Sequence, residues 1–490
     1  MKKFSKVLSI LLSVVLVISS FYLLYQVIRL NVLPSKFLFP LTIGVVVLDA
    51  IFILLLVYFS KNVVSKIVCI VLTLFICVAT CMGGYYISKT QGALSNITNV
   101  AKHAKNTVSV IVKESSSIKD KSQLNGVSVG NLRLNEQGSK KALKELSGEG
   151  IVLNQTEYDS MTALLEAFYN GEVDSIIINE SSRSQILDME AYSNFDSNTR
   201  VVYQTSYKVK NNDSAAAVSD ITSKPFNVLI SGSDTRGGFD ENGRSDVIMI
   251  ATVNPKTHTI LLTSVPRDFY VTTACDAGDG CMQGALDKIT HTGIHGTNTT
   301  KRTVEQLLGI EINYTFKVGF DTVTDLVDAL GGVDVYVEPG YAVHNEYINV
   351  KEGVNHLYGK EALDYARERY AYSEGDRQRT KNQQQVLMGI VKEATKPSVI
   401  TNYAAIMDTM ANTFSTTMSN EEITDLIKYQ LNNNPTWKME QYMVDGTGDT
   451  LMCAELGDAA SVMVPDQSTV KMAKDKINAV LAGKSSEDVK

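Results

Sequence analysis

The sequence predicts an α/β protein with three N-terminal transmembrane helices, a small accessory α/β domain, and a larger α/β domain whose central mixed sheet is flanked by helices. Three apolar runs open the chain, and short apolar strands then alternate with segments of helical spacing. A length of 490 residues allows two or three domains. We expect a membrane anchor at 1–88, a linker at 89–107, the accessory domain at 108–215 and the larger domain at 225–484.

The membrane anchor is predicted from the runs Val7–Ile28, Phe37–Phe59 and Ile67–Ile87. Each has about 21 to 23 residues, enough to cross a hydrocarbon core of about 30 Å. A cleaved signal peptide is the alternative for the first run, but no small-residue cleavage site follows it. More lysines flank the side that holds the N-terminus, which places that end in the cytoplasm. Everything after about Lys89 is then expected outside the cell.

Charge is unevenly distributed along the chain. Residues 1–90 carry eight basic side chains and one acid, whereas the other 400 residues hold 38 of the 46 basic and 52 of the 53 acidic groups. A segment with that acidic excess is a poor general binder of nucleic acid, because such affinity comes from cations that neutralise phosphates. We therefore expect no direct nucleic-acid partner, and the apolar runs exclude a soluble cytosolic enzyme.

Cysteine placement agrees with this topology. Three cysteines lie in the third apolar run, where they act as small apolar residues. Cys275 and Cys281 share one loop in the part expected outside the cell, where a disulfide between them and a pair of free thiols are both open. Cys453 has no expected partner.

The accessory domain shows three expected strands, in VSVIVK, LNGVSVG and VDSIIIN, and two helices, in SKKALKEL and MTALLEAFYN. Between Val108 and Lys210 there is no His, no Cys and no Gly-rich phosphate loop. The domain is thus interpreted as a spacer or a protein-docking module. The polar stretch at 209–224 is expected to be a linker.

Two acids in the larger domain come from neighbouring strand ends. Asp234 follows the strand that begins at Phe226, and Asp246 begins the next strand, with Arg236 and Arg244 between them. Carboxylates in such a position are suitable ligands for Mg²⁺, which retains water and takes further oxygens from substrate phosphates. The alternative for this motif alone is an acidic, Gly-rich hairpin loop that binds nothing.

Arginines gather at the same expected edge. Arg267 follows a strand whose exit is fixed because the residue before Pro266 must stay extended. Arg367 and Arg369 would share one face of an extended segment, and Arg379 and Gln383 one face of a helix. Forked guanidinium groups suit a pyrophosphate. The alternative is a solvated helix with Arg–Glu pairs.

Other chemistries have weaker support. Asp376 after Gly375 is expected to cap the helix that carries Arg379. His291 and His295 have the spacing of a metal-binding pair, but no third ligand is near, so we interpret them as helix-surface or core residues. The sequence contains no GxSxG elbow and no GxxxxGK[ST] loop.

These motifs, in this order, resemble those of the LytR-CpsA-Psr family. The matching segments are SGSDTRGGFDENGRSDVIMIATVNP, SVPRD, DKITHTGIHG and ARERY…GDRQRTKNQQQ, from Phe226 to about Gly483. Three spans and an intervening domain resemble the streptococcal capsule CpsA type. The resemblance implies a membrane-anchored phosphotransferase that moves a polymer, such as a capsular polysaccharide, from an undecaprenyl-pyrophosphate carrier to peptidoglycan. The capsule synthesis machinery is a further candidate partner.

The resemblance also implies roles for particular residues. Asp234, Asp246 and Arg267 are expected to be catalytic, with the two acids binding Mg²⁺. The expected pyrophosphate-binding residues are Arg244, Arg267, Lys288, Arg367, Arg369, Arg379 and Gln383. The general base is left open between Asp234 and a neighbouring acid. A regulator of capsule biosynthesis, whether an attenuator or a module that presents the lipid pyrophosphate, and a polyprenyl-pyrophosphate phosphatase are the rival functions, because the same residues would serve all of them.

Overall fold

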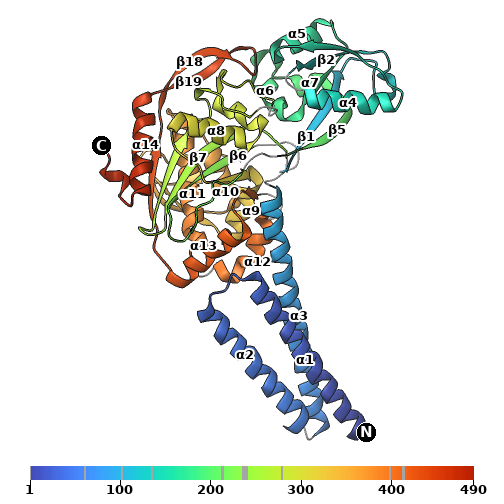
Figure 1. Ribbon diagram of the computed structural model, residues 1–490, viewed down its shortest axis with the longest axis vertical. Helices are drawn as coiled ribbons and strands as arrows, with labels where there is room; N and C mark the ends of the chain where they lie inside the picture. Colours follow the sequence, from blue (N-terminus) through green and yellow to red (C-terminus); the bar gives the residue numbers. More distant parts are fainter. Residues whose placement is uncertain are drawn as a thin grey trace.

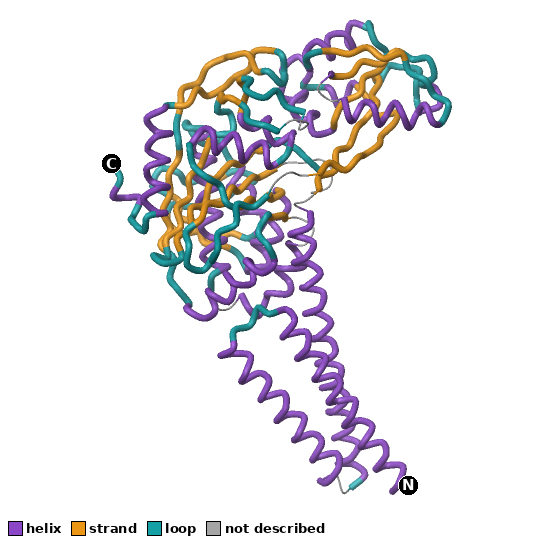
Figure 2. The backbone as a smooth tube through the Cα atoms, in the orientation of Figure 1, coloured by secondary structure: helices purple, strands orange, loops and turns teal. Residues whose placement is uncertain are grey.

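A computed structural model describes residues 2–59, 62–100, 103–133, 136–210, 214–233, 241–276, 280–396, 399–410 and 414–490. A helical stalk carries the larger domain, and the accessory domain lies beside that domain at the end far from the tip of the stalk (Figure 1). Strands are confined to these two domains, and the stalk is helical (Figure 2).

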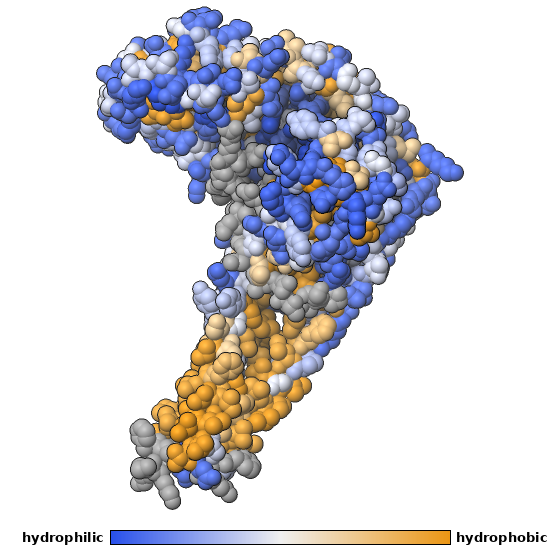
Figure 3. Space-filling view, turned by 180° about the vertical axis from the view of Figure 1, so that it is seen from behind, coloured by the Kyte–Doolittle hydropathy of each residue, from blue (hydrophilic) through white to orange (hydrophobic). Residues whose placement is uncertain are grey.

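The stalk is formed by α1 (Lys2–Leu30), α2 (Ser35–Leu54, continued by a π-helix at Leu55–Phe59) and α3 (Val63–Val100). All three are long and apolar enough to cross a membrane. On the face seen in Figure 3, their outer surface is mostly apolar. Inside the bundle, Ser20 Oγ donates a hydrogen bond of 2.9 Å to Asp49 Oδ1, which joins α1 to α2.

The prediction of a linker at 89–107 is wrong. Helix α3 continues to Val100, and the first strand of the accessory domain begins at His103. The cause is tertiary packing, because Ala93, Leu94 and Ile97 are buried against the larger domain in a cluster with Phe414. An apolar face that is covered in this way stabilises helix well beyond the apolar run of the span.

The accessory domain is a five-stranded sheet in the order β3-β2-β4-β1-β5, with helices packed on it. Its strands are β1 (His103–Lys113), β2 (Ser128–Leu132), β3 (Asn154–Tyr158), β4 (Ser175–Asn179) and β5 (Thr199–Lys210). Its α-helices are α4 (Glu136–Gly148), α5 (Met161–Asn170), α6 (Arg183–Asp188) and α7 (Phe195–Asn198). The sequence missed β3 and β5. Strand β3 is a largely exposed edge strand and thus lacks an apolar run, and β5 extends into the expected linker.

The larger domain is built on a six-stranded mixed sheet in the order β16-β11-β6-β7-β8-β17. Strand β7 pairs antiparallel with β6 and β8, whereas the β11–β6 and β8–β17 pairs are parallel. The strands of this sheet are β6 (Phe226–Ser233), β7 (Ser245–Asn254), β8 (Thr259–Val265), β11 (Tyr314–Gly319), β16 (Phe414–Thr416) and β17 (Lys438–Met443). The expected central mixed sheet is confirmed.

Shorter strand pairs and helices surround this sheet. The remaining strands are β9 (Tyr270–Thr272), β10 (Leu286–Lys288), β12 (Val333–Val337), β13 (Val343–His344), β14 (Asn349–Val350), β15 (Gly353–Leu357), β18 (Gly446–Cys453) and β19 (Asp458–Pro465). The helices are α8 (Thr297–Leu308), α9 (Phe320–Leu330), α10 (Gly359–Arg367), α11 (Asp376–Ala394), α12 (Val399–Met410), α13 (Asn420–Asn433) and α14 (Gln467–Leu481).

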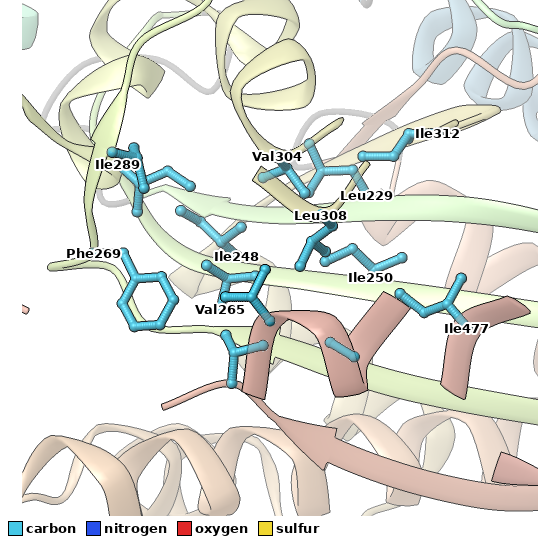
Figure 4. Close-up of a cluster of buried hydrophobic side chains, with 14 of the residues drawn as sticks. Leu229, Ile248, Ile250, Val265, Phe269, Ile289, Val304, Leu308, Ile312 and Ile477 are labelled. Carbon is cyan, nitrogen blue, oxygen red and sulfur yellow. The ribbon is translucent and has the colours of Figure 1, made fainter. Parts of the chain in front are cut away.

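Successive side chains of the sheet pack alternately in two apolar cores, one on each face of the sheet. Ile248 and Ile250 of β7 pack with α8 and α14 in one core (Figure 4). Met249 of the same strand packs in the other core, toward α11 and α13. Because successive strand residues point to opposite faces, one apolar strand serves both layers.

Helix α11 is fixed closely against its neighbours. Gln384 Nε2 donates to Ser264 Oγ at 2.9 Å and to Tyr442 O at 2.8 Å, which ties the helix to β8 and β17. A Cβ at Gly389 would lie 2.9 Å from Asp334 O and 3.0 Å from Val333 Cβ. The absent side chain at this position therefore sets how closely α11 approaches β12.

Gly389→Ala should push α11 away from β12 and lower the free energy of unfolding by about 1–3 kcal/mol, the usual cost of overpacking. Gly448→Ala is the matched control, because no atom lies within 4 Å of its Cβ position. Denaturant unfolding of both variants measures the difference. Equal stability of the two would contradict the close packing of α11.

Glu440 of β17 anchors the C-terminal residues. Its carboxylate accepts hydrogen bonds from Ser485 Oγ at 2.7 Å and from Ser486 N at 2.8 Å. It also forms an ion pair with Lys438 Nζ at 2.8 Å. Burial opposes the charged form of this carboxyl, but these partners outweigh it and lower its pKa from 4.5 to about 2. A depressed carboxyl pKa stabilises the fold above its unfolded value, and that contribution is lost as pH falls through the folded value.

Glu440→Gln should therefore lower Tm most above about pH 5, where the unfolded carboxyl is also ionised. The difference from wild type should shrink as pH falls toward about 2, where both folded and unfolded carboxyls become protonated. Thermal unfolding followed across this pH range provides the test. A difference independent of pH would mean that the charge of Glu440 does not stabilise the fold.

Candidate active site

A cleft opens where β7 begins and β8 ends, against the start of α11. The residues that line it come from both strands, the turn after β8, the first two turns of α11 and the strands β17 and β19: Asp246, Val247, Ile248, Ser264, Val265, Pro266, Arg267, Asp268, Asp376, Arg377, Arg379, Thr380, Gln383, Met443, Val444, Asp445 and Met463. Polar and charged groups therefore converge on one edge of the sheet, as the sequence predicted.

Asp246 and Arg267 form the ion pair at the floor of this cleft. Arg267 Nη1 donates to Asp246 Oδ1 at 2.8 Å. The antiparallel register that pairs Ile248 with Val265 brings the first residues of β7 opposite the turn after β8. The carboxyl of Asp246 is only 9% exposed, so its pairing with the guanidinium lowers the cost of its burial.

Helix α11 supplies the second wall of the cleft. Arg379 and Gln383 lie one turn apart and both line the cleft, as their spacing predicted. The expected cap is wrong, because the cap position is Gly375 (φ 51°) and Asp376 is the first residue of the helix. The carboxyl of Asp376 instead pairs with Arg379 Nη2 at 3.3 Å and with Arg369 Nη1 at 3.6 Å.

Three guanidinium groups are crowded at this edge. Burial, followed by repulsion from Arg267, lowers the pKa of Arg379. A hydrogen bond to the Tyr370 hydroxyl and the charge of Asp376 raise the pKa of Arg369, against repulsion from Arg267. Burial opposes the charge of Arg267 too, but Asp246 and Asp268 outweigh it and raise its pKa. An anion that enters the cleft would relieve this mutual repulsion.

Lys288 and Arg244 lie at the rim of the cleft. Lys288 Nζ is 3.5 Å from Asp268 Oδ1, and Asp268 lines the cleft beside Arg267. Arg244 Nε is 3.9 Å from Asp246 Oδ1, and its Nη1 donates to Asp188 of the accessory domain. The structure thus brings both predicted cations near the acids without placing them in the cleft wall.

Arg367 departs from the expected arrangement. The sequence favoured an extended segment that presents Arg367 and Arg369 together, but Arg367 is the last residue of α10. Ala362 and Tyr365 are buried at helical spacing, and this burial keeps the segment helical. Arg367 is not among the described residues that line the cleft, whereas Arg369 reaches it through Asp376.

Asp234 and Arg236 lie outside the described residues, so the metal-binding role of Asp234 stays a prediction. Several cleft residues were missed by the sequence reading, namely Asp376 as an ion-pair partner, Arg377 and Asp445. Arg377 Nη2 pairs with Asp445 Oδ2 at 2.6 Å across the mouth of the cleft. Helical spacing from Arg379 does not indicate Arg377, because residues two apart point in different directions.

The two cysteines left open by the sequence form a disulfide, Cys275–Cys281. Near this loop, His291 and His295 lie in a 3₁₀ helix at Ile289–His295, where residues four apart do not share a face. His291 Nδ1 pairs with Asp287 at 2.7 Å, and His295 Nε2 with Glu455 at 3.0 Å. His291 and Asp287 are buried, which supports the core interpretation for His291, whereas His295 and Glu455 are partly exposed.

The cleft contains hard oxygen ligands of the type that Mg²⁺ binds. A carboxylate oxygen at the floor of a cleft is a hard ligand of the type that Mg²⁺ selects, and the ion usually takes only one or two carboxylates together with water and phosphate oxygens. Asp246 fits that requirement. Among the described residues, no group of three or more His, Cys, Asp or Glu is placed to hold an ion by protein ligands alone.

Comparison with known proteins identifies the fold of this domain. The relatives include a polyisoprenyl-teichoic acid–peptidoglycan teichoic acid transferase, TagU, of Bacillus cereus, 31% identical over 48% of this chain and 75% of the relative. TagU of Bacillus subtilis is 35% identical over 41% of this chain and 63% of the relative.

Solved structures with similarity to this chain include protein gbs0355 from Streptococcus agalactiae, with a TM-score of 0.46 at 26% identity, covering 54% of this chain and 89% of that one. The crystal structure of B. subtilis TagU has a TM-score of 0.41 at 29% identity, covering 53% of this chain and 97% of that one. The model of the LytR_cpsA_psr family matches residues 191–479, more than half of the chain. The chain therefore belongs to the LytR-CpsA-Psr family.

Proposed function

We propose that this protein is a membrane-anchored phosphotransferase that moves a wall polysaccharide from an undecaprenyl-pyrophosphate carrier to peptidoglycan. The crowding of Arg267, Arg369 and Arg379 around one cleft is the observation that carries the proposal. Such a cluster is suited to a pyrophosphate, which brings several negative charges and accepts bidentate hydrogen bonds. Relatives named as polyisoprenyl-teichoic acid–peptidoglycan transferases support the same class of reaction.

In this reaction a hydroxyl oxygen of peptidoglycan forms a bond to the phosphorus next to the polymer. The bond from that phosphorus to the bridging oxygen breaks, and the lipid phosphate leaves with the bonding electrons while the hydroxyl proton is released. Arg267 and Arg379 would bind the oxygens on which negative charge develops, so that positioning and electrostatics lower the barrier. Gln383 would hold a further phosphate oxygen one helical turn from Arg379.

Asp246 would hold a magnesium ion together with Asp234. A bound magnesium ion would supply charge neutralisation and polarisation at the phosphate oxygens. The carboxyl of Asp246 is already paired with Arg267 at 2.8 Å. That pairing already commits one oxygen of Asp246 to a cation, which suits a role in binding charge better than a role as general base.

The proposal also specifies the donor polymer and the side of the membrane on which the cleft lies. We infer a capsular polysaccharide as the donor polymer, because three spans followed by an accessory domain are the arrangement of the CpsA type. The excess of lysines at the N-terminal side of the stalk supports an orientation with the N-terminus in the cytoplasm and the cleft outside the cell. Peptidoglycan would then be accessible to the cleft, and the capsule synthesis machinery would supply the donor.

Arg267→Ala should reduce transfer by about 10²–10³-fold, because it removes a donor to the developing charge. Arg302→Ala is the control. Arg302 lies on α8, pairs with Asp276 and does not line the cleft. The assay uses the full chain, a short-chain lipid pyrophosphoryl oligosaccharide and a peptidoglycan fragment, and measures oligosaccharide attached to the fragment. Wild-type turnover in Arg267→Ala would remove this arginine from the mechanism. Release of free oligosaccharide phosphate would indicate a hydrolase.

Chelation of divalent cations should abolish transfer, and added Mg²⁺ should restore it. Asp246→Asn should weaken this dependence, so that about tenfold more Mg²⁺ is needed for half-maximal rate, as expected from the loss of one carboxylate ligand. Asp445→Asn is a matched control, because Asp445 lines the same cleft but pairs with Arg377. Full transfer in the presence of chelator would contradict the magnesium proposal.

A further inference from the structure

The accessory domain is docked on the larger domain through the hairpin β18–β19, which reaches across to it (Figure 1). The backbone N and the Oγ1 of Thr162 both donate to Leu456 O, at 3.1 and 3.0 Å. Met189 packs on an apolar cluster of this hairpin that contains Cys453 and Val462. A turn between two strands is therefore held by both polar and apolar contacts.

A second contact lies beside Glu241, close to the start of β7. Thr107 Oγ1 donates to Glu241 Oε1, and Lys105 Nζ lies 3.3 Å from the same oxygen. Lys317 Nζ of the larger domain donates to Glu241 O. Glu241 is buried, so this charged junction is shielded from solvent. Together with the β18–β19 hairpin, it attaches the accessory domain at two separate points.

Between these two points an acid of the accessory domain reaches the rim of the cleft. Asp188, the last residue of α6, accepts a hydrogen bond from Arg244 Nη1. The side chain of Arg244 is 13% exposed, and its Nε is buried without a hydrogen-bond acceptor among the described residues. That Nε lies 3.9 Å from Asp246 Oδ1, the oxygen that also accepts from Arg267.

We propose that Asp188 is a positioning residue, through which the accessory domain holds the Arg244 guanidinium beside the Asp246–Arg267 pair as a further binding group for the pyrophosphate. This inference rests on the proposed function and deepens it. It assigns the accessory domain a part in substrate binding, in place of the spacer role that its sequence indicated.

The physical basis is the entropy of a long side chain. A free arginine loses rotamer freedom when a ligand immobilises it. Asp188 already restricts the Arg244 side chain before the substrate binds. Less rotamer entropy is therefore lost in the binding step, and the affinity for the substrate is higher. Asp188 is 60% exposed and binds only Nη1, and Nε has no acceptor in the part of the chain that the structure describes. Arg244 thus keeps a donor and most of its charge for a phosphate oxygen.

The test is a double-mutant cycle on the full chain in detergent or nanodiscs, with Asp188→Ala, Arg244→Ala and the double variant. The two measurements are the affinity for a short-chain polyprenyl pyrophosphate and the kcat and KM of transfer. Asp188→Ala should weaken binding and raise KM by roughly two- to fivefold, within the range of an exposed ion pair, with kcat nearly unchanged. In the Arg244→Ala background the same substitution should have no further effect.

Two controls separate positioning from folding. Glu149→Ala removes an accessory-domain acid that pairs with Lys121 at 2.5 Å, away from the cleft, and should leave affinity unchanged. Asp188→Glu keeps a carboxylate and should retain most of the affinity. All variants should show the thermal unfolding of the wild type.

Three outcomes would overturn the inference and leave the proposed function standing. Equal affinity of the wild type and Asp188→Ala would show that Asp188 has no role in binding. Tighter binding by Asp188→Ala would mean that Asp188 competes with the substrate for Arg244. Equal losses from Asp188→Ala with and without Arg244 would indicate a purely structural effect. Failure of the wild type itself to bind would overturn the proposed function, and this inference with it.

Discussion

Repulsion between like charges is the constraint that the larger domain has to overcome. Arg267, Arg369 and Arg379 approach one another closely enough for the charge of Arg267 to oppose those of the other two. Such a group is held only by a scaffold whose other interactions exceed the repulsion. The apolar cores on both faces of the mixed sheet provide that scaffold, and Asp246 and Asp376 offset part of the charge.

The two walls of the cleft are fixed by different means. On the sheet side, antiparallel pairing of β7 and β8 places Asp246 and Arg267 together, since backbone hydrogen bonds set the register. On the helix side, Gln384 and Gly389 hold α11 at close distance, and α11 then carries Arg379 and Gln383. The register of the sheet and the close packing of α11 therefore determine where these charged residues lie.

The sequence was most informative where local rules determine position. Strand ends and helical spacing were enough to bring Asp246, Arg267, Arg379 and Gln383 to one edge, and the cleft contains all four. Such rules failed where contacts distant in sequence decide the outcome. Asp376 follows a glycine and resembles a helix cap, but the nearby guanidinium groups recruit its carboxyl.

Long-range contacts also explain the remaining differences. Nothing near Asp188 in the sequence indicates a partner 56 residues away, and their meeting depends on how two domains dock. The same holds for the end of α3, whose polar sequence was expected to form a linker. Burial of Ile97 against the larger domain, which only the folded chain provides, extends the helix.

Rigid attachment on two sides has a consequence for the proposed substrate. The end of α3 packs against the larger domain. Lys36 at the start of α2 donates a hydrogen bond to Asn432 O of α13, and Lys428 of α13 donates one to Asn31 Oδ1 in the loop between α1 and α2. A lipid carrier keeps its tail in the bilayer, so it offers its pyrophosphate only within a limited height above the membrane. A cleft fixed to the stalk below and to the accessory domain beside it meets that requirement without a conformational search, because the positions of its cations are set before the lipid binds.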